Sequence, residues 1–189
     1  MRKVLIFLFF FNSITMYSQY NWQYFIDQAS VNQNSQKYLD AITNYNSALE
    51  LLPDSLNEQI SLTYWNLQYC YSSLKENSMA ISACYSWINK GGWYLGNAYY
   101  CLGINYYNNG EYSKAIDAYT NAIQYSNSVI EGRPLNINDI YSYIKYNYQK
   151  LGYSYGSVPK ALFWKVSIPH GYWEWQDKGK TCCINTFAV

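Results

Sequence analysis

Few residues in this chain of 189 could perform acid–base or nucleophilic chemistry, and they are not clustered. The single histidine, His170, lies between Pro169 and Gly171, and it would have to supply any general base with an unperturbed pKa near 7. A histidine in that setting is typical of a surface loop. Late in the chain, only Glu174 and Asp177 form a close pair of carboxylates, such as glycoside hydrolysis needs. The sequence therefore predicts no enzyme.

Motifs that hold metal ions or nucleotides are missing as well. No His-Glu-x-x-His, Cys-x-x-Cys or Asp-rich calcium loop occurs. Gly179-Lys180-Thr181 looks like the end of a phosphate-binding loop, but that motif needs a glycine where Glu174 stands. We therefore expect neither a metal nor a cofactor.

Five cysteines are the remaining reactive groups. Cys70, Cys84 and Cys101 fall in expected helices, where a free cysteine packs as a small apolar residue. We favour that role over a Cys84–Cys101 bridge, although spacing alone fixes no pairing. The adjacent Cys182 and Cys183 could be redox-active or could cross-link to another chain.

The N-terminus has the parts of a secretory signal, which we assign to residues 1–18. Arg2 and Lys3 precede an apolar run from Val4 to Phe11, which is too short to span a membrane. An uncleaved anchor is the less favoured alternative. Cleavage implies a secreted or periplasmic protein with no membrane span. Removing Arg2 and Lys3 leaves 11 of the 13 basic residues against 12 acidic ones, so the mature chain is nearly neutral and fits no nucleic-acid partner.

The elements that must position any site show helical periodicity. In the stretch 98–123, AYYCLGINYYNNGEYSKAIDAYTNAI, apolar residues recur three and four apart on both sides of Asn109-Gly110. Gly110 suits the left-handed residue that follows a helix end. We expect two helices that approach closely at Gly103, Ala115 and Ala122, with tyrosine rings filling the space beside them.

This stretch resembles the tetratricopeptide repeat (TPR), whose signature is W-x2-L-G-x2-Y…A-x3-F…P with a period of 34 residues. The matching positions are Tyr99, Leu102, Gly103, Tyr106, Ala115, Tyr119 and Ala122. Two earlier copies start at Phe25 and Tyr64. Their second helices carry Ala41 and Ala80, which lie 74 and 35 residues before Ala115.

A degenerate fourth repeat or end cap is expected at 139–168. Its first helix would use Tyr141, Ile144 and Tyr148, with Asn138 or Asp139 as N-cap, and Ala161 would begin the second. The prediction is thus an all-α fold: a right-handed α-solenoid of antiparallel helix pairs, with about three TPR-like repeats plus this unit. The repeat domain covers 20–168, and 169–189 is a C-terminal segment of unknown structure.

The resemblance implies a protein-interaction module that holds a partner peptide or helix in a concave groove. In repeat proteins the first helix of each pair lines this face. The groove residues that we expect are Trp65, Tyr69, Asn97, Tyr100, Ile104, Tyr107 and Tyr146. The groove lacks the lysines with which some family members grip a C-terminal carboxylate.

Other interpretations stay open. The tyrosine and tryptophan rings of the expected groove could instead pack against residues 170–189. Exposed Trp and Tyr could also stack on sugar rings, which would make the chain a carbohydrate-binding envelope protein. An enzyme with a site in 139–189 is the weakest alternative.

Overall fold

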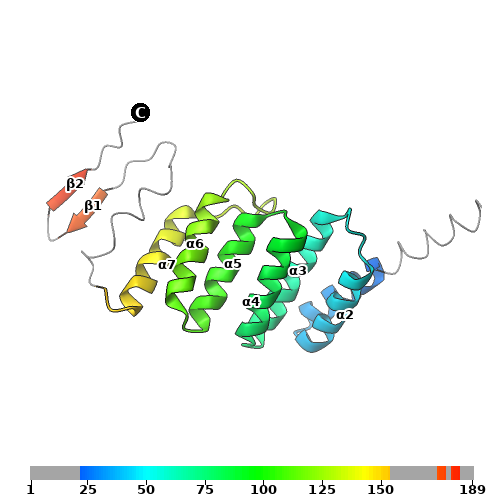
Figure 1. The fold of residues 1–189 in the computed structure, drawn as a ribbon. Coiled ribbons are helices and arrows are strands. Elements are labelled where there is room, and N and C mark those ends of the chain that lie inside the picture. Colours follow the sequence, from blue (N-terminus) through cyan, green and yellow to red (C-terminus); the bar gives the residue numbers. More distant parts are fainter. Residues whose placement is uncertain (1–21, 154–173, 178–179, 184–189) are drawn as a thin grey trace, which may run out of the picture.

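Helices standing side by side in one row form most of the molecule (Figure 1). The computed structural model describes residues 22–153, 174–177 and 180–183, so the proposed signal at 1–18 lies outside it. A helix at 22–34 is followed by α2 (Tyr38–Leu51), α3 (Asn57–Ser73), α4 (Asn77–Ser86), η1 (Trp87–Gly91), α5 (Leu95–Asn108), α6 (Tyr112–Gln124) and α7 (Ile137–Lys150). The predicted all-α solenoid of helix pairs is confirmed. A short antiparallel hairpin, β1 (Glu174–Asp177) with β2 (Lys180–Cys183), is additional.

Each helix packs mainly against its neighbours in sequence. Contacts run from α2 to α3, α3 to α4, α4 to α5, α5 to α6 and α6 to α7, and α3 also touches α5. Contacts confined to neighbouring units are the property that defines a solenoid.

The turn inside each helix pair repeats almost identically, which fixes the register of the repeats. A residue with positive φ occurs at Gln36 (59°), Lys75 (62°) and Gly110 (78°), five residues before the alanines Ala41, Ala80 and Ala115. After each of them, a backbone N–H bonds to the carbonyl five residues back, as Glu111 does to Tyr106 at 2.9 Å.

The C-terminal end of α7 has the same turn. Gly152 has a φ of 85°, and the N–H of Tyr153 bonds to the carbonyl of Tyr148 at 3.1 Å. The end of α7 thus has the same geometry as the end of the first helix in each earlier pair. Ala161, which the sequence suggested for its second helix, lies outside the described residues. The expected N-cap is wrong by two or three positions, because Asn136 caps α7 by accepting from the N–H of Asn138 at 3.1 Å.

Small residues let the paired helices approach, as predicted. Ala115 and Ala122 are fully buried, and the Tyr119 ring lies against Gly103, where an added Cβ would be 2.6 Å from Cε1 of that ring. The second pair differs, because Trp87 stands where Ala122 stands in the third. This ring is fully buried, and the helix widens there into the π-turn η1.

Side-chain amides link one helix pair to the next. Gln33, from the helix at 22–34, accepts from the Tyr45 hydroxyl at 2.8 Å and from the Cys70 thiol of the next pair at 3.6 Å. Gln68 accepts at 3.1 Å from Asn105, which lies one pair further along. Because hydrogen bonds are directional, these side chains hold neighbouring pairs in one register.

The thiols of Cys70, Cys84 and Cys101 are buried and free, which confirms the packing role over the bridge. Burial raises the pKa of Cys70 to about 11 and that of Cys101 to about 12, because a thiolate there would lose its hydration. These thiols therefore remain protonated at neutral pH.

Candidate functional site

Tyrosine rings from α5, α6 and α7 meet on one surface. The Tyr100 ring lies 6.2 Å from that of Tyr143, and the Tyr107 ring lies 5.7 Å from that of Tyr146, measured between centroids. Tyr119 of α6 stacks on Tyr143 at 5.6 Å and is tilted against Tyr100 at 6.1 Å. We call these five residues the tyrosine cluster. Three predicted groove residues, Tyr100, Tyr107 and Tyr146, thus come together.

Hydrogen bonds join four hydroxyl groups of the cluster in two pairs, Tyr100 with Tyr143 and Tyr107 with Tyr146. Burial, and then the hydrogen bond with Tyr143, raise the pKa of Tyr100 well above its usual value. The hydroxyl of Tyr107 donates to Tyr146, which raises the pKa of Tyr107 and lowers that of Tyr146. Lys150 adds to the lowering of the Tyr146 pKa, since its ammonium bonds to the same oxygen and lies 5.1 Å from the ring centroid.

The cluster is partly open to solvent. Tyr143 is 41% exposed and Tyr146 is 43% exposed, whereas Tyr119 beneath them is buried. Exposed rings whose hydroxyls are already positioned offer both an apolar face and a polar edge to a ligand. This combination is common at the centre of protein interfaces.

Two further predicted residues lie on α3, one repeat earlier. Tyr69 is 46% exposed and meets Tyr38 edge to face at 6.3 Å. Trp65 is half-buried, and the guanidinium of Arg133 lies 4.3 Å from its ring centroid. Ile104 of α5 is half-buried and packs against the core. Trp65 therefore has a cation over one ring face, which leaves Tyr69 as the open ring of α3.

Asn97 is a correction to the predicted site. Only 7% of it is exposed, because the segment between α6 and α7 folds over it. Its Oδ1 accepts from the N–H of Ile130 at 2.7 Å, and its Nδ2 donates to the carbonyl of Arg133 at 3.4 Å. The side chain is fully used in holding this connection, so it does not line an open groove.

Sequence reasoning missed Tyr143 and Arg133. Tyr143 lies three residues before Tyr146, the one residue of α7 that the sequence assigned to the groove, and the packing of α7 on α6 places its ring against Tyr119. Arg133 belongs to a loop without periodicity, so no pattern could have placed it over Trp65. A signal for Tyr143 did exist, since α7 has tyrosines at four positions that cover more than one face: Tyr141, Tyr143, Tyr146 and Tyr148.

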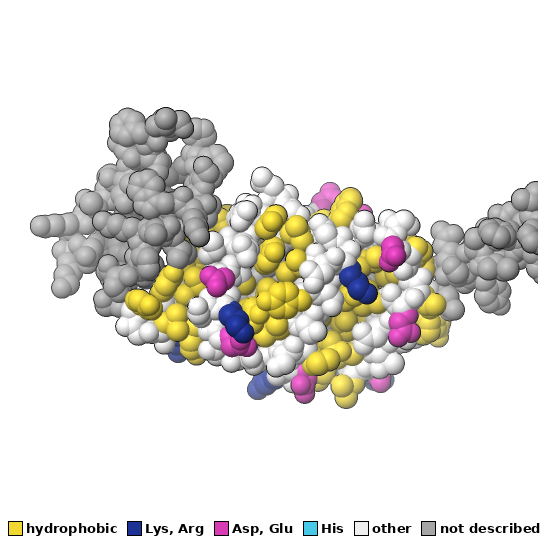
Figure 2. All heavy atoms as spheres, viewed as in Figure 1, with side chains coloured by type: hydrophobic (Ala, Val, Ile, Leu, Met, Phe, Trp, Pro, Cys, Tyr) yellow, Lys and Arg dark blue, Asp and Glu magenta, His cyan; other side chains and the backbone are white. Residues whose placement is uncertain are grey.

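Charge is sparse on the surface. On the face that Figure 2 shows, the few charged side chains lie among hydrophobic and neutral polar ones, and one basic side chain lies against an acidic one. Within residues 22–153 and the hairpin strands, no three His, Cys, Asp or Glu residues are grouped to hold a metal ion. In the same residues, no helix is both long and apolar enough to cross a bilayer.

Comparisons with known proteins agree with this geometry. The family model of the tetratricopeptide repeat matches residues 96–128, which cover α6 and all of α5 except its first residue. No curated protein matches the chain.

Solved structures share the arrangement of the helices. The first TPR of Spaghetti (RPAP3), solved bound to the HSP90 peptide SRMEEVD, is 16% identical with a TM-score of 0.57 and covers 70% of this chain and 94% of its own. The Sgt2 TPR domain from Aspergillus fumigatus is 17% identical with a TM-score of 0.54 and covers 69% and 79%. Likeness at such identities concerns the fold. The chain thus contains a tetratricopeptide repeat at residues 96–128, set in a row of helix pairs with the fold of a TPR domain.

Proposed function

We propose that this protein is an exported, non-catalytic interaction module that binds an extended peptide or a helix of a protein partner. The observation that carries the proposal is the tyrosine cluster, which brings exposed rings of α7 and half-buried rings of α5 together on one surface. The first TPR of Spaghetti offers a precedent for peptide binding on this fold.

The cluster suits a protein ligand for a physical reason. Tyrosine provides a large contact area with few rotatable bonds, so little conformational entropy is lost on binding. The ring contacts and the Tyr107–Tyr146 hydrogen bond hold the rings in place before a partner arrives. Such preorganisation lowers the cost of association.

The test is photocrosslinking in the native cell followed by a binding measurement. A photoreactive phenylalanine derivative at position 146 should crosslink a defined protein, whereas the same group at Tyr24, which is exposed on the helix at 22–34, should not. Against the purified partner, the variant Tyr107→Ala/Tyr146→Ala should lose about 2 kcal/mol or more of binding energy, and Tyr24→Ala should lose none. Equal crosslinking from both positions would contradict the proposal, as would protection of the cluster by a glycan.

Export is the second part of the proposal, and the basic and apolar parts of residues 1–18 support it. Deletion of these residues should leave the protein in the cytoplasm of its host. Sequencing of the mature N-terminus should find cleavage near Ser18 or Gln19. A mature chain that still begins at Met1 would refute cleavage.

A further inference from the structure

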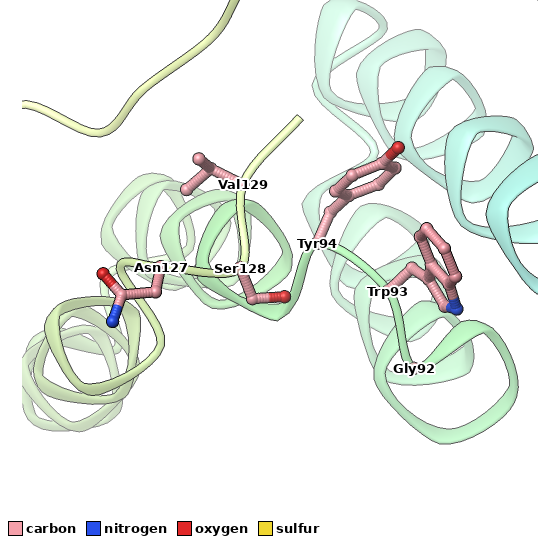
Figure 3. A pocket seen from close by; sticks show the side chains of 6 residues that line it. All are labelled: Gly92, Trp93, Tyr94, Asn127, Ser128 and Val129. Carbon is pink, nitrogen blue, oxygen red and sulfur yellow. The ribbon is translucent and has the colours of Figure 1, made fainter. Parts of the chain in front are cut away.

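A second concave site lies at a different place from the tyrosine cluster. It is a pocket of about 300 Å³ between the turn that enters α5 and the turn that follows α6 (Figure 3). This volume is at the lower end of the range for ligand pockets, about 300–1,000 Å³, so the pocket suits a small ligand or one end of a longer one. Its walls are Gly92, Trp93, Tyr94, Asn127, Ser128 and Val129.

Two aromatic rings form one wall. Trp93 is 48% exposed, and its ring meets that of Tyr94 at 81° with centroids 6.0 Å apart. Figure 3 shows both rings on one side, with the Ser128 side chain reaching toward them from the opposite turn. Because about half of Trp93 is exposed, part of its indole surface is available for an apolar ligand face to stack against.

The backbone holds this wall rigidly. Tyr94 has a φ of 58°, a conformation that costs energy for a side chain of its size, and such strain is concentrated at functional sites. The Trp93 carbonyl accepts from Nε1 of the buried Trp87 at 2.9 Å. The two turns are joined because Ser128 accepts from the N–H of Leu95 at 3.0 Å and from the N–H of Gly96 at 2.9 Å. The pocket is therefore formed before any ligand binds.

The charges around the pocket restrict its ligand. None of its six lining residues is charged. Outside the wall, the Tyr94 hydroxyl donates to Glu58, and this bond, with Glu58 and Glu131 nearby, raises the pKa of Tyr94 to about 12. Two neighbouring carboxylates disfavour an anionic ligand, since like charges repel at short range.

A ligand must therefore combine a flat apolar face, a hydroxyl group for the serine side chain, and no negative charge. We propose that this pocket is a binding site for a neutral saccharide, with one sugar ring stacked on Trp93. The proposal does not depend on the peptide-binding function, because the pocket shares no residue with the tyrosine cluster.

The experiment titrates the full mature chain with four neutral probes: maltohexaose, cellohexaose, xylohexaose and chitohexaose. Calorimetry measures affinity up to about 10 mM sugar, which covers weak millimolar binding. The indole N–H signal of Trp93 is identified in an NMR spectrum by its loss in Trp93→Phe. We expect saturable binding of at least one probe, a shift of that signal, and no binding of an oligogalacturonate.

Variants then separate stacking from fold. Trp93→Ala should weaken binding about tenfold or more, and Trp93→Phe should retain a measurable part of it. Tyr24→Ala, which removes an exposed ring from the helix at 22–34, should bind as the wild type does. Absence of saturable binding by all four probes overturns the proposal, as does an unmoved Trp93 signal or equal binding of the oligogalacturonate. The signal shift is measured on the wild type, so it decides the question even if Trp93→Ala misfolds.

Discussion

At the scale of single residues, Gly103 shows how closely the helices of the third pair approach. A Cβ at this position would lie 2.6 Å from the Tyr119 ring, which is itself buried and has no space to move. Gly103→Ala gains up to about 1 kcal/mol of helix propensity, but overpacking costs about 1–3 kcal/mol, so the net change is destabilising.

Urea unfolding followed by circular dichroism checks this prediction. Ser113→Ala, at an exposed position on α6, is the matched control and should leave the midpoint nearly unchanged. A Gly103→Ala variant as stable as the wild type would show that the two helices are farther apart than the structure has them.

The hydroxyl groups of Tyr100 and Tyr119 make the folding stability depend on pH. Burial raises both pKa values in the folded protein above the value of about 10 expected in the unfolded chain. The folded state therefore binds these protons more tightly. The stability that they contribute is complete below about pH 10 and decreases as the pH rises above it.

Unfolding experiments at several alkaline pH values measure this slope. The variant Tyr100→Phe/Tyr119→Phe should lose less stability between pH 9 and pH 11 than the wild type does, since phenylalanine does not titrate. Tyr24→Phe, which removes an exposed hydroxyl, should keep the wild-type slope. Identical slopes in all three proteins would refute the assignment.

At the scale of elements, the connection between α6 and α7 is held in place by hydrogen bonds to α5. Asn97 anchors it through the N–H of Ile130 and the carbonyl of Arg133. Asn97→Ala leaves that buried N–H without a partner, which costs about 1–3 kcal/mol.

Hydrogen–deuterium exchange locates the effect. In Asn97→Ala, the amide of Ile130 and its neighbours should exchange faster, while Asn108→Ala, an exposed change on the same helix, should leave them protected. Unchanged protection in Asn97→Ala would mean that other contacts hold the loop.

The elements were predictable from the sequence because their signals are periodic. The spacing of apolar residues three and four apart predicts that Tyr106 and Ala115 lie in the core of the third pair. The structure confirms that both are buried. The prediction for Asn97 was wrong because a residue that points away from its partner helix is exposed only if no other segment covers it. The covering loop has no period, so its path depends on hydrogen bonds that the sequence does not reveal.

At the scale of the whole molecule, contacts between neighbours imply graded stability. Tyr45 of α2 is almost fully buried and bonds to Gln33, so Tyr45→Ala should cost about 3–5 kcal/mol. Because α2 packs chiefly on α3 and not on the third pair, the loss should be concentrated in the first pair.

Exchange mass spectrometry distinguishes local from global opening. In Tyr45→Ala, peptides from 22–51 should exchange much faster, and those from α5 and α6 should remain close to wild type. Leu39→Ala, an exposed change on the same helix, is the control. Uniform acceleration along the chain would show a single cooperative unit instead.

The amides that join the pairs also limit how such a chain can evolve. Gln33 fits the thiol of the second pair, and Gln68 fits Asn105 of the third. If these pairs were reordered, each amide would lose its present partner, and for the buried Gln68 the cost would be about 1–3 kcal/mol. The first three helix pairs are therefore not interchangeable modules, because the first and the second each carry an amide matched to the pair that follows.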